Sequence, residues 1–309
     1  MKMKTGKLLA LLVCLFLMGC LLIIRNIPNK DSAHNISPKP KMDIFAKVLQ
    51  NWPKDKPKAF IYFLLQDNPE RMQKFWKALE SLEKFFNLKY NYPIIIFHES
   101  SFKNTTKKEI KSRTQNIVIF QLVEFMIPSF INSSKLMKSK VCYRDIGYKH
   151  MCRFHSKQVP QHPVMKKFDF YLRLDDDSLF LKPINYDIFR YFRDNNYMYG
   201  YLIMTQDQAR CVTGLWESTE KYCKKNNIIP KFAWKKNTIF YNNFEISRTS
   251  IWSGDAYSKY IDYIDSLGGI YYNRWGDAPI KSLALSIFVQ RSKITKMPHI
   301  SYEHQGIRS

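Results

Sequence analysis

The chain has 309 residues, of which 45% are hydrophobic and 15% aromatic, so it can bury a substantial core in one large domain or two small ones. This composition excludes extended disorder outside the N-terminus. The formal net charge of +23 indicates polyanionic partners or a solvated basic surface. Because the basic residues are spread along the chain, without zinc-finger spacing, a glycine-rich RNA-binding signature or a basic tail, we do not expect nucleic-acid binding.

The N-terminus carries an uninterrupted apolar run, residues 8–24. As a helix this run would span roughly 26 Å, which suits the thin membranes of the early secretory pathway, about 27 Å across. More positive charge precedes the run than follows it: Lys2, Lys4 and Lys7 against Arg25 and Lys30. We therefore predict a cytosolic tail (1–7), a transmembrane signal-anchor (8–24) and a lumenal remainder. The alternatives are a cleaved signal peptide, which lacks a clear cleavage site here, and a lipoprotein box at LMGC (17–20), after which the apolar run continues.

The segment after the apolar run is rich in Asn, Lys, Pro and Ser, so we predict a lumenal stem over residues 25–57 and a globular domain over 58–309. An even number of cysteines remains in the predicted lumenal part: Cys142, Cys152, Cys211 and Cys223. In an oxidising compartment they predict one or two disulfides. A four-cysteine zinc site is the alternative, but the CxxC spacing typical of such sites is absent.

Three apolar runs predict buried strands, at residues 59–65, 93–97 and 117–123. Asn68 and Pro69 after the first run are typical of a helix start. Apolar residues with helical spacing follow: Met72, Phe75, Leu79, Leu82 and Phe86. A polar, helix-compatible stretch separates the second and third runs. The resulting β-α-β-α-β order predicts a parallel sheet and a Rossmann-like half, and the absence of GxGxxG disfavours a dinucleotide dehydrogenase.

Three consecutive aspartates, 175–177, follow the next predicted strand, 168–174, which itself follows a predicted helix over 143–157. Ligands of open α/β sheets bind beyond the carboxyl ends of strands. An Asp-x-Asp pair at such an end chelates a hard divalent cation, which in turn binds a diphosphate, as in nucleotide-sugar transferases of the GT-A class. The alternative interpretation is a solvated acidic turn or a helix N-cap.

Five segments of the chain form a more specific pattern: YKHMCRF (148–154), YLRLDDD (171–177), NFEI (243–246), GGIYYNRWGDAPIKS (268–282) and ISYEH (300–304). In this order they resemble the fungal Golgi α-1,2-mannosyltransferases, the glycolipid 2-alpha-mannosyltransferase family (glycosyltransferase family 15), over about residues 58–306. The resemblance implies an α/β fold of the GT-A type, with a Rossmann-like mixed sheet flanked by helices.

The resemblance also implies roles for single residues. His304 would be a direct Mn²⁺ ligand, with Asp175 and Asp177 near the metal and the donor. Glu245 would be the nucleophile or the stabiliser of charge on the mannose, and Tyr148 would lie near the acceptor. Asp277 is a further acid near the sugar. Three arginines are candidates for neutralising the diphosphate: Arg153, Arg173 and Arg274.

Each role has a structural alternative. His304 would otherwise be an exposed histidine, and Glu245 a buried acid paired with an arginine. Tyr148 would be a core residue, as Trp275 is expected to be. Asp277 would cap a helix beginning at residue 278.

The chain departs from the family pattern in three places. Asp175-Asp176-Asp177 replaces Glu-Pro-Asp, which shortens the first acid by one methylene. Gln66-Asp67-Asn68 replaces an Arg-Asn-Ser-type turn, so an arginine able to contact the nucleotide is missing there. Residues 238–242 replace a segment that contains a family cysteine, so the disulfide pairing cannot be copied from the family.

The resemblance implies a retaining, Mn²⁺-dependent transfer of mannose from GDP-mannose to a mannoside of a glycoprotein or glycolipid, with an α-1,2 linkage. It implies a single-pass type II Golgi membrane protein with a lumenal catalytic domain. The rival hypotheses are a GT-A enzyme for another nucleotide sugar, a non-catalytic mannoside-binding protein, and a metal phosphoesterase. The last would ordinarily bring histidines with metal-ligand spacing, and the chain has 7 histidines without such a cluster.

Overall fold

The computed structural model describes residues 43–136, 142 and 144–309, and Ile44–Ser309 form one compact unit. The predicted cytosolic tail, the signal-anchor and most of the stem lie outside the described residues. Among the helices of the described part, none is long and apolar enough to cross a membrane. The compact unit starts before the predicted domain boundary at residue 58, because helix α2 (Ile44–Leu49) buries Phe45 in the core.

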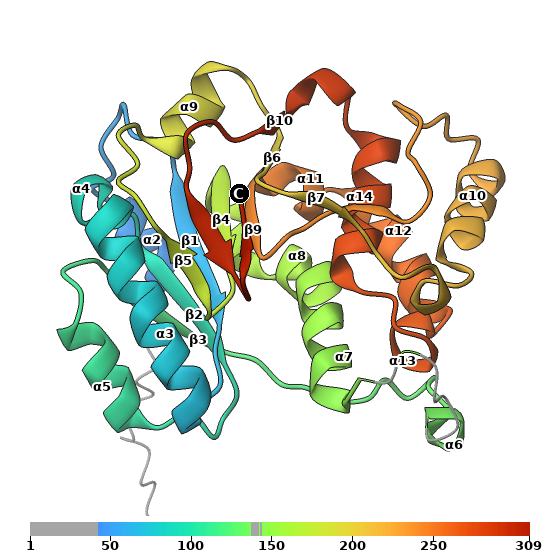
Figure 1. Ribbon diagram of the computed structural model, residues 1–309, viewed down its shortest axis with the longest axis horizontal. Coiled ribbons are helices and arrows are strands. Elements are labelled where there is room, and N and C mark those ends of the chain that lie inside the picture. The colour runs from blue at the N-terminus through green and yellow to red at the C-terminus, as the bar shows by residue number, and fades with distance from the viewer. Residues whose placement is uncertain (1–42, 137–141, 143) are drawn as a thin grey trace, which may run out of the picture. The chain divides into compact units, whose positions relative to one another are not determined.

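A seven-stranded mixed sheet forms the centre of this unit, in the order β10-β6-β9-β4-β1-β2-β3 (Figure 1). Its strands are β1 (Ala59–Leu64), β2 (Ile94–His98), β3 (Val118–Leu122), β4 (Phe170–Leu174), β6 (Tyr199–Tyr201), β9 (Phe244–Arg248) and β10 (Ile294–Lys296). Strand β9 runs antiparallel to both neighbours, β4 and β6, and the other neighbours pair in parallel. The predicted mixed α/β sheet is therefore confirmed, and its first half has the predicted β-α-β-α-β order.

Strand β1 shows how both faces of the sheet are covered. Phe60 and Tyr62 pack in one core cluster with residues of α7 and of helices α11 to α14. Ala59, Ile61 and Phe63 pack in a second cluster with residues of α3 and α9 on the opposite face. A strand buried on both faces has an unbroken apolar sequence rather than an alternating one, which is why residues 59–65 were recognisable.

Local signals set the helix boundaries. Helix α3 starts at Pro69, and the side-chain oxygen of Asn68 accepts a hydrogen bond from the Arg71 amide at 2.9 Å, as predicted. Helix α7 continues through a π-helical turn to Gln158, close to the predicted helix 143–157. The helices besides α2 are α3 (Pro69–Leu82), α4 (Leu88–Tyr90), α5 (Asn104–Ser112), α6 (Ser133–Leu136), α7 (Ile146–Arg153), α8 (Val159–Gln161), α9 (Ile188–Asp194), α10 (Leu215–Lys225), α11 (Thr249–Ser253), α12 (Asp255–Ser266), α13 (Gly269–Tyr272) and α14 (Asp277–Phe288).

Two small sheets complete the strands of the described part. One pairs β7 (Met204–Gln206) with β8 (Thr238–Phe240). The other has the order β12-β11-β5 and contains β5 (Ser178–Phe180), β11 (Tyr302–His304) and β12 (Ile307–Arg308). Its register places His304 opposite Ser178, directly after the three aspartates. Segments more than a hundred residues apart thus meet at the carboxyl end of β4, the edge at which such sheets bind ligands.

Candidate active site

Two cavities lie at the carboxyl ends of the central parallel strands. The strand-end cavity, of about 560 Å³, is lined by the ends of β1 and β2 and the start of α7. The acid-lined cavity, of about 550 Å³, is lined by the aspartates after β4 and the start of α14. Five residues line both: Leu64, Arg71, Tyr148, Met151 and Asp176. Each volume is typical of a small-molecule site.

The lining of the acid-lined cavity carries one more negative than positive charge, since five aspartates face four arginines. These residues are Asp175, Asp176, Asp177, Asp207, Asp277, Arg71, Arg144, Arg173 and Arg274. A diphosphate entering this cavity would meet a slightly unfavourable field. A divalent cation reverses the sign of that field.

His304, Asp175 and Asp177 form what we name the open cluster. The Nε2 atom of His304 lies 2.9 Å from an Asp177 carboxylate oxygen and 3.6 Å from one of Asp175. Both His304 Nε2 and this Asp177 oxygen are buried, and neither has a hydrogen-bond partner among the described residues. On the other side of the ring, Nδ1 lies 3.1 Å from the Tyr241 hydroxyl, which fixes the ring orientation.

The open cluster fits a divalent cation. Ligand atoms about 2.1 Å from an octahedral ion, at right angles, lie roughly 3 Å apart, which matches the separation of His304 Nε2 and the Asp177 oxygen. Within the described residues, no group of three His, Cys, Asp or Glu side chains converges closely enough to enclose a metal. These side chains would therefore supply only part of a coordination sphere, as is usual where phosphate and water supply the rest.

Arg173 on β4 links the open cluster to Asp277, the first residue of α14. Its guanidinium lies 3.1 Å from an Asp175 oxygen and pairs with the Asp277 carboxylate. Asn242 donates a further hydrogen bond to Asp277 at 2.9 Å. Although burial acts in the opposite direction, the Arg173 charge lowers the pKa of Asp277 well below its usual range. Asp277 is therefore an ionised, fixed carboxylate on the cavity wall.

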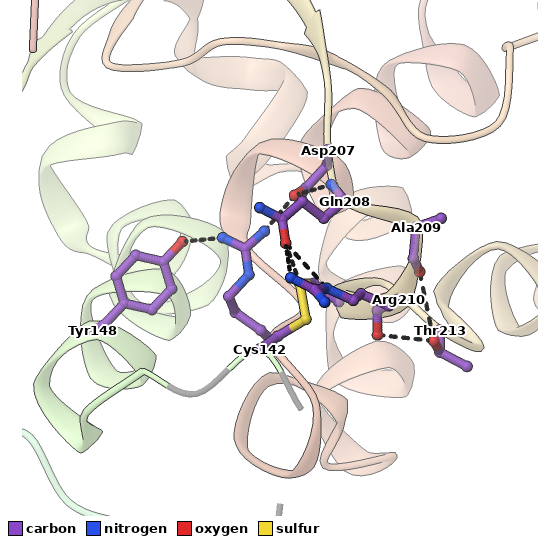
Figure 2. Close-up of a disulfide and its surroundings, with 9 residues drawn as sticks. Cys142, Tyr148, Asp207, Gln208, Ala209, Arg210 and Thr213 are labelled. Atoms are coloured by element: carbon purple, nitrogen blue, oxygen red, sulfur yellow. Dashed lines mark hydrogen bonds and ion pairs between the residues drawn. A yellow bond between two sulfur atoms is a disulfide. The ribbon is translucent and has the colours of Figure 1, made fainter. Parts of the chain in front are cut away.

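Tyr148 is held by a second arginine. Arg274 donates a 3.1 Å hydrogen bond to the Tyr148 hydroxyl and pairs with Asp207, and Figure 2 shows the hydroxyl directed toward Asp207 and its neighbours. Burial raises the pKa of Tyr148, so the hydroxyl stays protonated.

A disulfide between Cys142 and Cys211 joins the segment before Tyr148 to the loop that follows Asp207 (Figure 2). Cys152 and Cys223 are free and buried. The prediction of one or two disulfides is therefore confirmed with one pair, and the cysteines do not form a zinc site.

Glu245 belongs to a different environment, which we name the closed cluster: Glu245, Lys281, Tyr171 and Tyr199. The Glu245 side chain is fully buried, lines neither cavity, and lies 2.5 Å from Lys281 Nζ. The hydroxyls of Tyr171 and Tyr199 donate to its two carboxylate oxygens. The expected role of Glu245 beside the sugar therefore stays a prediction, since its carboxylate does not reach either cavity in this structure. Glu245 is a buried paired acid, as the alternative held, but with lysine in place of arginine.

Arg153 is also away from the cavities. Its guanidinium makes two hydrogen bonds of 2.9 Å to Asp265 of α12, and it lines neither cavity. Trp275 is buried, as expected, with its indole donating to the Thr213 carbonyl. The other predicted site residues all line the acid-lined cavity: Tyr148, Arg173, Asp175, Asp177, Arg274, Asp277 and His304.

Sequence reasoning missed several partners of these residues. Lys281 had a visible signal, since it is the single charge within the otherwise apolar part of α14 and such a lysine needs a buried counter-ion. Asp207 and Tyr241 had no comparable signal. Asp176 was visible only as a departure from the family pattern and Arg71 gave no signal, because their pairing depends on the tertiary structure.

The comparisons with known proteins cover most of the chain. A profile of the family described as glycolipid 2-alpha-mannosyltransferase matches residues 24–309. The probable mannosyltransferase KTR3 of Saccharomyces cerevisiae is 30% identical over 75% of this chain and 63% of the relative. The O-glycoside alpha-1,2-mannosyltransferase omh1 of Schizosaccharomyces pombe is 31% identical over 74% and 65%, respectively. The chain thus spans less than two thirds of the length of these curated relatives.

Two solved structures share the fold. Core-mannan synthase A (CmsA/Ktr4) from Aspergillus fumigatus, in its Mn/GDP form, is 26% identical with a TM-score of 0.76, covering 82% of this chain and 76% of its own. The mannosyltransferase Ktr4p from S. cerevisiae, in complex with GDP, is 28% identical with a TM-score of 0.76, covering 82% and 72%. The family profile, the curated relatives and the fold agree: this chain belongs to the glycolipid 2-alpha-mannosyltransferase family.

Proposed function

We propose that this chain is a retaining, Mn²⁺-dependent mannosyltransferase of the GT-A type. It transfers mannose from GDP-mannose to a hydroxyl of a mannoside on a glycoprotein or glycolipid, forming an α-1,2 linkage. The observation that carries the proposal is the open cluster, where the buried His304 Nε2 lies 2.9 Å from an Asp177 oxygen and neither atom has a hydrogen-bond partner among the described residues. The names of the relatives and the Mn/GDP form of one solved relative support it.

His304 and Asp177 would hold the metal directly, with Asp175 beside it. When bound, the ion neutralises the diphosphate and stabilises GDP as the leaving group. Tyr241 keeps the His304 ring turned so that Nε2 faces the aspartates. Arg173 holds the Asp175 carboxylate in place through an ion pair.

On the sugar side, Asp277 is the fixed carboxylate that can stabilise positive charge developing at the anomeric carbon. Arg173 and Asn242 hold its carboxylate in one orientation. The Tyr148 hydroxyl, fixed by Arg274, lies where both cavities meet and would orient the acceptor hydroxyl. Glu245 would act from behind this wall, by neutralising Lys281.

We also propose a Golgi location, with residues 8–24 as a signal-anchor and the catalytic unit in the lumen. The Cys142–Cys211 disulfide supports an oxidising compartment. A protease-protection experiment on intact microsomes tests this topology. The catalytic unit should be resistant until detergent is added, and digestion without detergent would contradict a lumenal location.

The activity test uses the full-length chain in detergent with GDP-mannose, Mn²⁺ and methyl α-mannoside, following GDP release and disaccharide formation. We expect EDTA-sensitive product that the Asp177→Asn variant does not make, while Asp262→Asn, a half-exposed acid on α12, serves as the matched control. NMR of the disaccharide determines the linkage and the anomeric configuration.

Three results would change the proposal. Turnover of another nucleotide sugar in place of GDP-mannose would support the GT-A fold assignment and contradict GDP-mannose as the donor. Mannoside binding without turnover of any donor would identify a non-catalytic binding protein. Product formation that resists EDTA would contradict the metal site.

A further inference from the structure

We propose that Arg71, held in place by Asp176, binds the diphosphate of the nucleotide donor at the junction of the two cavities. The proposal rests on the proposed function and adds a donor-binding residue outside the five segments that carry the family resemblance. In that pattern position 176 is a proline, and the arginine of the first βα turn would stand near position 66. Here a glutamine stands at position 66. Arg71, five residues later, forms an ion pair with Asp176.

The location of the pair supports this role. Arg71 lies in the first turn of α3, after β1, and Asp176 follows β4, so the pair spans the carboxyl ends of two adjacent strands. Both residues line the strand-end cavity and the acid-lined cavity. A nucleotide sugar is a nucleoside and a sugar joined by a diphosphate. A donor that occupies both cavities therefore places its diphosphate next to this pair.

The geometry of the pair prepares the guanidinium for a second anion. Arg71 Nε donates to one Asp176 oxygen at 2.5 Å and Nη2 donates to the other. Nη1 has no hydrogen bond to the described residues. The Arg71 side chain is 34% exposed, whereas that of Asp176 is 2% exposed. One edge of the guanidinium is thus anchored in the protein, and the other is available to a phosphate oxygen, which reduces the entropy lost on binding.

The competing explanation is that the pair is only a latch between α3 and the turn after β4, with Arg71 neutralising a buried carboxylate. The two explanations predict different GDP binding for one variant. In Arg71→Gln/Asp176→Asn, no buried charge is left unpaired, so a latch role predicts that GDP binding returns to the wild-type level. A phosphate-binding role predicts that the double variant still binds GDP weakly.

The experiment is calorimetric titration of the full-length chain in detergent with Mn²⁺, using GDP, GMP and guanosine as probes. The variants are Arg71→Gln and the double variant. The matched control is Arg193→Gln, because Arg193 is also paired with an aspartate, is 38% exposed and lies outside both cavities. Thermal unfolding without ligand reports the structural cost of each substitution.

We expect both Arg71 variants to bind GDP about ten- to a hundredfold more weakly, the loss of one hydrogen bond between charged groups. Guanosine affinity should be unchanged, with GMP between the two, and Arg193→Gln should behave as wild type. Equal losses for GDP and guanosine, or wild-type GDP binding by the double variant, would overturn the proposal.

The experiment distinguishes a wrong donor assignment from a wrong role for Arg71. If the wild type binds another nucleoside diphosphate and not GDP, the donor is wrong, and the same variants then test Arg71 with that diphosphate. If the wild type binds no nucleoside diphosphate in the presence of Mn²⁺, both proposals fail. If Arg71→Gln alone does not fold, the double variant, which buries no unpaired charge, still gives the deciding comparison.

Discussion

The open cluster after β4 and the closed cluster beginning on β9 are both acidic, and the two strands are antiparallel neighbours in one sheet. In the closed cluster, both carboxylate oxygens of Glu245 accept hydrogen bonds, and its charge is balanced by Lys281. In the open cluster, the facing atoms of His304 and Asp177 are buried and lie 2.9 Å apart, and neither makes a hydrogen bond that satisfies it among the described residues. Neighbouring strands thus carry one satisfied and one unsatisfied acidic cluster.

The difference separates structural acids from acids that await a ligand. A buried polar atom without a partner costs free energy, so a protein retains such atoms where a bound group satisfies them. A fully paired buried acid needs no ligand and contributes through its partner. Residue type alone does not distinguish the two cases, since carboxylates occur in both clusters. The predictions below change one cluster at a time.

The largest expected effect is on stability, from the closed cluster. Lys281→Met leaves the Glu245 charge buried without a counter-ion, which should lower the free energy of unfolding by about 3–5 kcal/mol. Urea unfolding followed by tryptophan fluorescence measures it. The double variant Lys281→Met/Glu245→Gln should recover most of the loss, because no unpaired charge remains. An unchanged midpoint in the single variant would mean that Glu245 does not depend on Lys281 as its counter-ion.

In the open cluster, a substitution should affect metal binding more than stability. We expect Asp177→Asn to weaken Mn²⁺ binding at least tenfold, by removing one direct anionic ligand. The unfolding midpoint without metal should fall only modestly, because the amide keeps polar contacts with His304 and Gln305 although the charge that they stabilise is lost. Electron paramagnetic resonance of free Mn²⁺ measures the affinity. A large loss of stability together with unchanged Mn²⁺ affinity would reverse the comparison.

The smallest expected effect is a pH dependence from His155, a buried residue that lines the acid-lined cavity with its ring beside the Tyr62 hydroxyl. Burial lowers the pKa of His155 well below its ordinary value, helped by Arg173 and Lys281 and opposed by Asp277. The unfolded chain therefore takes up a proton below about pH 6.5 that the folded chain does not. Stability should fall as the pH drops from 7 to 5, by up to about 1.4 kcal/mol per pH unit.

His155→Gln keeps a polar group near Tyr62 and removes the titration, so its unfolding free energy should depend less on pH in this window. The other buried histidines remain in both proteins, and the difference between the two curves isolates His155. Parallel curves would show that His155 titrates in the folded protein as it does in the unfolded chain, against the expected lowering of its pKa.

Strands β1, β2 and β4 could be predicted because each is buried along its length and mostly apolar, with Arg173 the single charge in β4. Strands β6 and β10 have three residues each and give no such pattern. The open cluster was predictable only through the family pattern, since nothing local joins His304 to Asp177 across more than a hundred residues.

The orientation of the Glu245 side chain could not be predicted from the sequence, for a physical reason. Which face of β9 carries its side chain depends on the pairing with β4 and β6, and its counter-ion comes from α14. Asp176 was likewise indistinct within a run of three aspartates. Its burial follows from contact with Arg71 on a separate helix.

The Cys142–Cys211 disulfide has a consequence for how the protein is prepared. The two cysteines are 69 residues apart, and in the chain-entropy description a cross-link of this length stabilises the fold by about 4 kcal/mol. The cytosol of an ordinary bacterial host keeps thiols reduced. Material purified from such a host, or stored with a thiol reductant, lacks the restraint on the loop that carries Asp207, the partner of Arg274. Inactivity of such a sample would report its redox history rather than its site residues.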